Sequence, residues 1–458
     1  MEYELPEDIQ MLRQAVREFV SKEVAPIARE IDEEERVPFD VLRKAGDLGL
    51  LGVPFPEEFG GADAGVVGYC VLMEEIQRKC ASTATIIGAH AQLCAMSIYL
   101  SGTDAQKERY LRPLCEGKKL GAWALTEPNA GSDAAHISTV ARRDGDEWVL
   151  NGSKMWITNG SFADVLVVFA ANDRSLGARG GVTAFIVEKD FPGFKVGKVE
   201  PKMGLRASHT ASLFFEDCRV PAENVLGQVG AGFATAMQTL DIGRCGLGAS
   251  SLGSAKEAYE LSVKYAIERQ QFGRPIADFQ AIQFKLADMA VKIYAMERMV
   301  YDCAKQVDRG ENATFESSMV KLFCTESASQ VIDEAIQIHG GMGFSRELPL
   351  ERMYRDARAG LPAAPPQPPG PDAGACGGAV GGVPAHGALR AGEPAAGAHP
   401  RALPRGHGAA ARAARRGLRR RAHPQPGHAA RHQHGGRAHG AGGALDDGAR
   451  ARDALGGV

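Results

Sequence analysis

The chain has 458 residues, enough for about three domains at roughly 150 residues each. Its 44% hydrophobic and 24% charged residues are ordinary for a soluble globular protein with a sizeable core. The formal net charge of −3 argues against a nucleic-acid or membrane-surface binder. The nine cysteines form no CxxC pair, which argues against a metal site or a disulfide scaffold.

No segment reaches the ~18 uninterrupted apolar residues of a membrane-spanning helix. The acidic start, MEYELPEDIQ, lacks the basic region of a signal peptide. Cysteines without a disulfide pattern are typical of a reducing compartment. We therefore expect a cytoplasmic protein that does not associate with membranes.

Residues 1–119 predict an N-terminal α-helical domain. The apolar residues of its first helix recur at three- and four-residue intervals, which places them on one face: Ile9, Leu12, Val16 and Phe19. Pro26 is expected to end or kink that helix, because proline lacks a backbone donor. Thr103 and Gln106 form a capping-box pattern that predicts a helix from Asp104 to Leu114.

Residues 120–230 predict a middle β domain. An Asp-Gly turn at 144–147 joins two strand-like segments, STVARR and WVLNG, into a hairpin. Further short strands follow, separated by Gly, Pro and Asn, so we expect an antiparallel barrel or sandwich.

Residues 231–358 predict a C-terminal helical bundle. Long helical segments are expected at 247–267, 279–307 and 316–339, with short breaks that favour antiparallel neighbours. The predicted fold class is therefore α+β, in the order helix, β, helix.

Five motifs occur in a fixed order along these segments: WALTEPNAGSD (123–133), KMWITNG (154–160), AIERQQFGRPI (266–276), FQAIQFKLADM (279–289) and QIHGGMGF (337–344). Together they resemble the acyl-CoA dehydrogenase family over about residues 9–358. The resemblance implies one FAD per subunit, a homotetramer, and oxidation of an acyl-CoA thioester to the trans-2-enoyl thioester. It also implies electron-transfer flavoprotein as the acceptor.

The resemblance assigns roles residue by residue. Flavin contacts fall on Trp123, Leu125, Thr126, Ser132, Trp156, Ile157 and Thr158. Contacts to the cofactor of a neighbouring subunit fall on Arg269 and Gln280, and contacts to phosphate or ribose on Gln337, Gly340 and Gly341. Substrate contacts fall on Ser132, Asp241 and Arg244, and no metal ligand is implied.

Several of these residues also have a purely structural interpretation. Trp156 is compatible with an ordinary place in the sheet, and Gly340-Gly341 with a helix C-cap. Arg269 is compatible with a solvent-exposed charge on a helix, and we expect His339 to be a packed side chain and not a catalytic one.

The catalytic base of the family has no counterpart here. In most members a glutamate follows the RDAR-like stretch (355–358), and that position falls on Ala364. A branch of the family carries its base on the helix near Asp241, at a position that corresponds to Gly243. No catalytic residue is therefore intact, and the activity of this chain is expected to be impaired.

Residues 359–458 have a composition unlike the rest of the chain. Ala, Gly, Arg and Pro make up 74 of these 100 residues, and aromatic residues and Lys are absent. The segment carries 13 Arg against 5 Asp+Glu, whereas residues 1–358 carry 40 Lys+Arg against 51 Asp+Glu. Such a segment buries too little apolar surface to fold, so we expect a disordered tail.

The mixture is also what a GC-rich gene encodes when it is read out of frame, and we favour that explanation. Two alternatives remain open. One is a non-catalytic flavoprotein of the same fold whose basic tail binds nucleic acid, against which the lack of aromatic residues argues. The other is an acyl-CoA oxidase.

Overall fold

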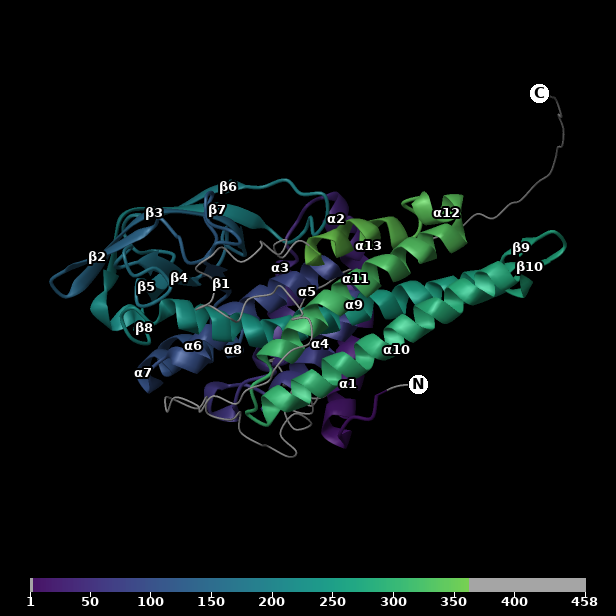
Figure 1. Cartoon of the computed structure of the whole chain (residues 1–458), viewed down its shortest axis with the longest axis horizontal. Coiled ribbons are helices and arrows are strands. Elements are labelled where there is room, and N and C mark those ends of the chain that lie inside the picture. Colours follow the sequence, from purple (N-terminus) through teal and green to yellow (C-terminus); the bar gives the residue numbers. More distant parts are fainter. Residues whose placement is uncertain (1–2, 362–458) are drawn as a thin grey trace, which may run out of the picture.

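The computed structural model describes residues 3–361, which form a helical, a β and a second helical region in chain order. This order confirms the predicted fold class. The three longest helices are α9 (Gly232–Glu268), α10 (Gln280–Asp308) and α11 (Thr314–His339). In Figure 1 the sheet lies at one end of the molecule, and these helices extend away from it to the opposite end. Ala364 and residues 362–458 lie outside the described residues.

The N-terminal region consists of short helices. They are α1 (Glu7–Phe19), α2 (Ala28–Glu33), α3 (Phe39–Asp47), α4 (Gly65–Lys79), α5 (Ala81–Gly88), α6 (Met96–Ser101), α7 (Asp104–Gln106) and α8 (Arg112–Cys115). Of these, α1 and α5 pack against α4. The predicted apolar face of α1 is buried throughout. A π-helical turn (Val20–Val24) and a 3₁₀ turn (Ala25–Ile27) follow α1, so Pro26 falls where the α-helix has ended.

The capping box at the start of α7 is confirmed. The Gln106 amide donates to Thr103 Oγ1 at 3.2 Å, and the Thr103 amide donates to Gln106 Oε1 at 3.0 Å. The helix expected to run on to Leu114 is interrupted by a π-helical stretch, Lys107–Leu111, before α8.

Residues 81–101 form one run of helix that is long and apolar enough to cross a membrane by length and composition, with a mean hydropathy of 1.2. The run comprises α5, a π-helical stretch (Ala89–Ala95) and α6. Because 72% of its most apolar window is buried inside the protein, it is a core element of this fold.

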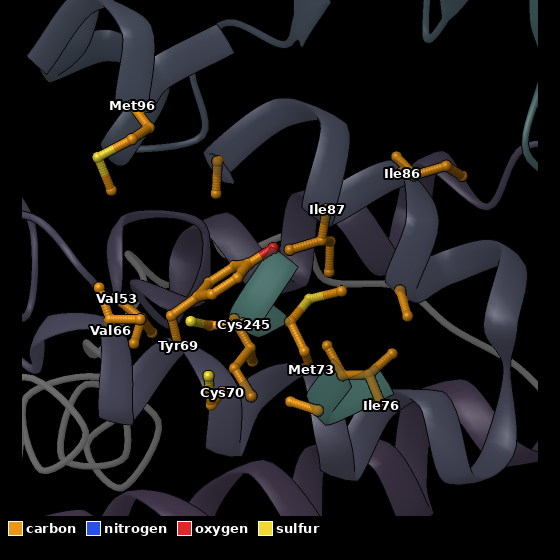
Figure 2. Packing of buried hydrophobic residues seen from close by; sticks show 14 of the residues in the cluster. Val53, Val66, Tyr69, Cys70, Met73, Ile76, Ile86, Ile87, Met96 and Cys245 are labelled. Atoms are coloured by element: carbon orange, nitrogen blue, oxygen red, sulfur yellow. The ribbon is translucent and has the colours of Figure 1, made fainter. Parts of the chain in front are cut away.

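The core of the helical regions is centred on α4. Figure 2 shows Tyr69, Cys70 and Met73 of α4 in one cluster with Ile87 of α5 and Cys245 of α9. All five side chains are buried. Burial of this face by both helical regions makes α4 the element that joins them.

The middle region is one mixed sheet with strand order β6-β7-β3-β2-β4-β5-β8 and with β1 beside β4. The strands are β1 (Gly121–Ala124), β2 (Val140–Asp144), β3 (Glu147–Thr158), β4 (Val165–Ala171), β5 (Val182–Glu188), β6 (Phe194–Val199), β7 (Thr210–Pro221) and β8 (Val225–Leu226). The β2–β3 hairpin turns at the predicted Asp-Gly site. Most pairs are antiparallel, as expected, but β1 and β2 each pair with β4 in parallel. The β2–β3 hairpin makes the connection from β1 to β4 long enough for a parallel pair.

The C-terminal helices α9, α10 and α11 span the three segments predicted from the sequence. A small hairpin, β9 (Gln270–Gln271) and β10 (Arg274–Pro275), joins α9 to α10. Two short helices, α12 (Gly341–Phe344) and α13 (Leu350–Ala357), close the described part of the chain. Large apolar side chains of α10 and α11 are exposed to solvent, namely Phe284, Val291, Tyr294, Phe315, Met319 and Leu322.

Candidate functional site

Two chain segments meet beside the sheet, one at the end of β1 and one in the second half of β3. The Met155 amide donates to the Thr126 carbonyl at 2.9 Å and joins them. Trp123 is half-buried, and its indole N–H donates to Ser97 Oγ at 3.1 Å. Leu125 is buried, so Thr126 is the first residue after β1 whose side chain reaches the surface.

Trp156 lies at a bulge of β3. The register with β7 shifts between Lys154 and Ile157, and the Trp156 backbone is left-handed, with φ 60°. A bulge of this kind turns a side chain away from the regular alternation. The Trp156 indole is 52% exposed as a result, whereas the next residue, Ile157, is buried.

Three hydroxyl residues lie on the segments connected to this indole, namely Thr126, Ser132 and Thr158. Within residues 3–361, no hydrogen bond engages the side-chain hydroxyls of Thr126, Ser132 or Thr158. Thr126 and Thr158 are half-buried and Ser132 is exposed. A Cβ added to Gly131 would meet nothing within 4 Å, so the space beside Ser132 is open. The Trp156 indole, called the Trp156 platform below, is thus a flat apolar group exposed to solvent, and the segments connected to it carry hydroxyls that are free within the described residues.

Asp241 and Arg244 lie one turn apart on α9 and form an ion pair. The Thr314 hydroxyl donates to Asp241 Oδ2 at 2.8 Å, and Arg244 Nη1 donates to Ser318 Oγ at 3.2 Å. Gly243 lies between them and is half-buried. A Cβ added to Gly243 would meet Gln92 Cγ at 3.6 Å and Leu93 Cδ2 at 3.8 Å, which is ordinary contact.

The other residues that the resemblance assigns to the cofactor do not lie near Trp156 of the same chain. Arg269 and Gln280 flank the β9–β10 hairpin, at the end of the molecule opposite the sheet, and both are exposed (Figure 1). Gln337, Gly340 and Gly341 lie at the C-terminal end of α11 and are exposed too. Two separate groups of candidate residues therefore exist on the chain.

Gly340 ends α11 in a conformation that requires glycine. Its φ is 56°, and its amide donates to the Gln337 carbonyl at 3.2 Å. The C-cap interpretation thus holds for Gly340, and it leaves the exposed face of the turn open, since a Cβ at Gly341 would meet nothing within 4 Å. His339 is buried and stacks on Tyr265 with ring centroids 4.3 Å apart, which fits the expected packing role.

A buried ion pair lies directly behind the Trp156 platform and was not predicted from the sequence. Lys154 Nζ is 2.6 Å from Glu127 Oε1, and both side chains are almost fully buried. Burial alone would raise the pKa of Glu127, but the Lys154 ammonium and donors from Ser138 and Thr139 hold that pKa at about 2. The sequence feature that could have indicated this ion pair is Lys154 itself, a lysine at an inward-facing position of β3 in the KMWITNG motif.

Asn159 was also missed. Its side-chain amide donates to the Ile86 and Gly121 carbonyls, both at 3.0 Å, and so joins the end of β3 to α5 and β1. Within residues 3–361, no group of three or more His, Cys, Asp or Glu side chains is placed to hold a metal ion.

Comparison with known proteins gives this geometry a family context. The three domain models of the acyl-CoA dehydrogenase family, N-terminal, middle and C-terminal, match residues 6–118, 122–218 and 230–362. The chain is 46% identical over 358 residues to a short-chain specific acyl-CoA dehydrogenase of Clostridium acetobutylicum, covering 78% of this chain and 94% of that protein.

Two solved structures are similar as well. Butyryl-CoA dehydrogenase of Megasphaera elsdenii is 43% identical with a TM-score of 0.77, covering 79% of this chain and 95% of that one. An acyl-CoA dehydrogenase of Bacillus anthracis complexed with FAD is 41% identical with a TM-score of 0.73, covering 78% of this chain and 64% of that one. The chain therefore belongs to the acyl-CoA dehydrogenase family, whose members are FAD-dependent oxidoreductases.

Proposed function

We propose that this chain is a dehydrogenase for short-chain acyl-CoA thioesters in which the catalytic base is missing, so that its turnover is close to background. The observation that carries the proposal is the exposed Trp156 indole together with two unpartnered hydroxyls, that of Thr158 two residues along β3 and that of Thr126, whose carbonyl accepts the Met155 amide. The short-chain preference is supported by the similarity to relatives named for short-chain and butyryl substrates.

The residues present fit FAD. An exposed indole held by a strained backbone is a platform on which a flat ring system can stack. The Thr126, Thr158 and Ser132 hydroxyls, which have no partner among the described residues, are available to ring heteroatoms and to substrate. FAD, when bound, supplies the acceptor for the hydride.

Substrate binding is assigned to Ser132 beside the platform and to Asp241 and Arg244 on α9. Arg244 is the cationic member of this set, and its ion pair with Asp241 fixes the direction of its guanidinium. The contact of Arg244 with Ser318 ties that guanidinium to α11 as well.

The chemistry needs a carboxylate within hydrogen-bond reach of the proton that leaves the α-carbon. Gly243 offers none, and Ala364 lies outside the described residues and has no carboxylate in any case. Flavin binding and proton removal thus depend on different residues. We expect this chain to bind flavin but to be unable to remove the proton from the α-carbon.

A homotetramer would explain why Arg269, Gln280, Gln337, Gly340 and Gly341 lie far from the Trp156 platform of their own chain. In a neighbouring copy they can reach that copy's cofactor. The exposed apolar side chains of α10 and α11 offer the surface that such an assembly would bury. The mass of the purified protein in solution, measured by light scattering, tests this. A monomer with bound flavin would contradict it.

Electron-transfer flavoprotein is the proposed acceptor, by family resemblance, and the cytoplasm is the proposed location. The eight cysteines among the described residues are all free and buried, which suits a reducing compartment.

The test is a flavin titration combined with a turnover assay. The purified chain, supplied with FAD, should acquire flavin absorbance. With butyryl-CoA and an artificial electron acceptor, its turnover should be lower than that of an intact relative by a factor of about 10²–10⁴, because a general base contributes about that factor to the rate. A folded chain that binds no FAD would overturn the assignment, and robust turnover would show that the base lies elsewhere.

A further inference from the structure

The Lys154–Glu127 pair is costly to bury, which raises the question of what it does. Lys154 is 0% exposed and Glu127 is 2% exposed. A buried ion pair can often be replaced by apolar side chains of similar volume with little loss of stability, because removing two charges from water is expensive. Stability alone therefore does not account for the pair. The pair makes directional hydrogen bonds, which apolar side chains of similar volume could not make.

Lys154 connects β3 to the segment that follows β1. Its ammonium donates to the Leu125 carbonyl at 3.1 Å and to Glu127 Oε1 at 2.6 Å. These two acceptors flank Thr126, whose own carbonyl accepts the Met155 amide. Thr126 is thus fixed from both sides by one stretch of β3.

Glu127 closes the loop that carries Ser132. Its Oε2 accepts the Ser138 amide at 2.5 Å and the Ser138 hydroxyl at 2.6 Å, and its Oε1 accepts the Thr139 amide at 3.0 Å. Glu127, which directly precedes loop 128–137, is therefore bonded through its carboxylate to Ser138 and Thr139, which directly follow the loop. Loop 128–137 has only a few further bonds of its own, among them those between the Glu127 and Ala130 backbones.

Trp156 is two residues beyond Lys154, and its left-handed backbone persists only if the neighbouring structure holds it. The buried ammonium fixes the strand immediately before the bulge. Thr126, Ser132 and Trp156, which come from three different segments, therefore share one buried anchor.

We propose that Lys154 and Glu127 are positioning residues that hold Thr126, Ser132 and Trp156 in the arrangement that binds flavin. Neither side chain reaches the surface, so Lys154 and Glu127 act through these three residues and do not contact the flavin themselves. The inference rests on the proposed function in so far as these three residues bind FAD.

The experiment replaces the pair by neutral side chains of similar size, Lys154→Met with Glu127→Gln. The matched control is Lys195→Met with Glu216→Gln, because Lys195 and Glu216 join the neighbouring strands β6 and β7 at the same 2.6 Å but are exposed at 61% and 63%. The dissociation constant for FAD, the visible spectrum of bound flavin and amide hydrogen exchange without cofactor are measured in both. Urea unfolding shows whether each variant folds.

The buried double variant should bind FAD about tenfold or more weakly, as removal of a supporting residue typically does. Its bound flavin should show a shifted spectrum, and loop 128–137 should exchange faster even without cofactor. The control should change none of these. Lys154→Met alone is measured as well, and Lys154→Arg, which keeps a cation, should recover part of the FAD affinity that Lys154→Met loses.

A folded buried variant with unchanged affinity and unchanged exchange in loop 128–137 would overturn the proposal. If the double variant does not fold, Glu127→Gln alone, which keeps the shape of the side chain, is judged by the same measurements. Failure of the unaltered chain to bind FAD would sink the proposed function instead, and the exchange data would still decide whether the pair fastens the loop.

Discussion

Trp156 has a left-handed backbone with φ 60°, a conformation that costs a bulky residue of order 1–3 kcal/mol. The cost is tolerated because both neighbouring parts of the strand are fixed, by the Met155–Thr126 bond before the bulge and by Asn159 after it. What the chain gains is an indole that faces outward from a strand whose next residue faces inward. Strain of this kind concentrates at functional sites.

Gly243 is the position at which we expect a single substitution to supply the missing base. Because a Cβ there makes only ordinary contacts, Gly243→Glu should be accommodated on α9, where Gly itself is about 1 kcal/mol less favourable than Ala. We expect acyl-CoA turnover to rise by about 10²-fold or more over the unaltered chain. Gly243→Gln, of equal size and without a base, is the control. Equal rates in the two variants would rule out a base at this position.

Glu127 should make stability depend on pH in the acid range. Its folded pKa of about 2 lies below its ordinary value of 4.5, so its ionised form stabilises the fold. The stabilisation is complete above pH 4.5 and is lost as the pH falls toward 2. Urea unfolding at about pH 5, 4 and 3 should show a steeper loss in the unaltered chain than in Glu127→Gln. Parallel curves would mean that Glu127 is not held ionised.

At the scale of elements, α4 joins the two helical regions, yet none of its own side chains caps its N-terminus. Asp308, the last residue of α10, does so from a distance of more than two hundred residues in sequence. Its Oδ1 accepts the Val66 amide at 2.7 Å and its Oδ2 accepts the Val67 amide at 3.0 Å. A long-range cap of this kind fixes the angle between two helices as well as the end of one.

Asp308→Ala should lower the free energy of unfolding by about 1–2 kcal/mol, the usual effect of removing an N-cap. Asp288→Ala is the control on the same helix, because Asp288 is exposed and its side chain makes no hydrogen bond or ion pair within residues 3–361. Denaturant midpoints of the two variants, compared with the unaltered chain, give the difference. Equal midpoints would show that water can replace the carboxylate as the partner of the Val66 and Val67 amides without loss of stability.

At the scale of the whole molecule, α13 joins all three regions just before the described chain ends. Arg355 Nη2 donates to Asp32 of α2 at 2.7 Å, and Arg355 Nη1 donates to the Met203 carbonyl of the sheet region at 3.1 Å. Asp356 accepts the Leu205 amide at 2.6 Å. The family's base follows this junction closely, so a rigid junction is what would position it.

Ala364 lies six residues beyond Arg358, outside the described residues. Ala364→Glu alone should leave turnover at background, because Pro362 and the Pro365-Pro366 pair restrict helix formation around it. A one- or two-base shift near codon 358 should instead encode a glutamate followed by Gly-Thr and then Ile-Gln, and the repaired chain should gain both turnover and FAD affinity. Translation of the coding DNA in all three frames checks this. If no frame encodes such a segment, the basic tail is genuine.

The sequence by itself determined the order of the helical and β elements, because helix periodicity, capping and turn signals are local. The apolar face of α1, the capping box at Thr103 and the hairpin at Gly145 were all predictable for that reason. Only the tertiary structure decided the parallel pairing of β1 with β4, the bulge that exposes Trp156 and the partnership of Lys154 with Glu127. Each of these depends on which distant segments pack together, and the cost of burying a charge is offset only by a partner that folding brings to it.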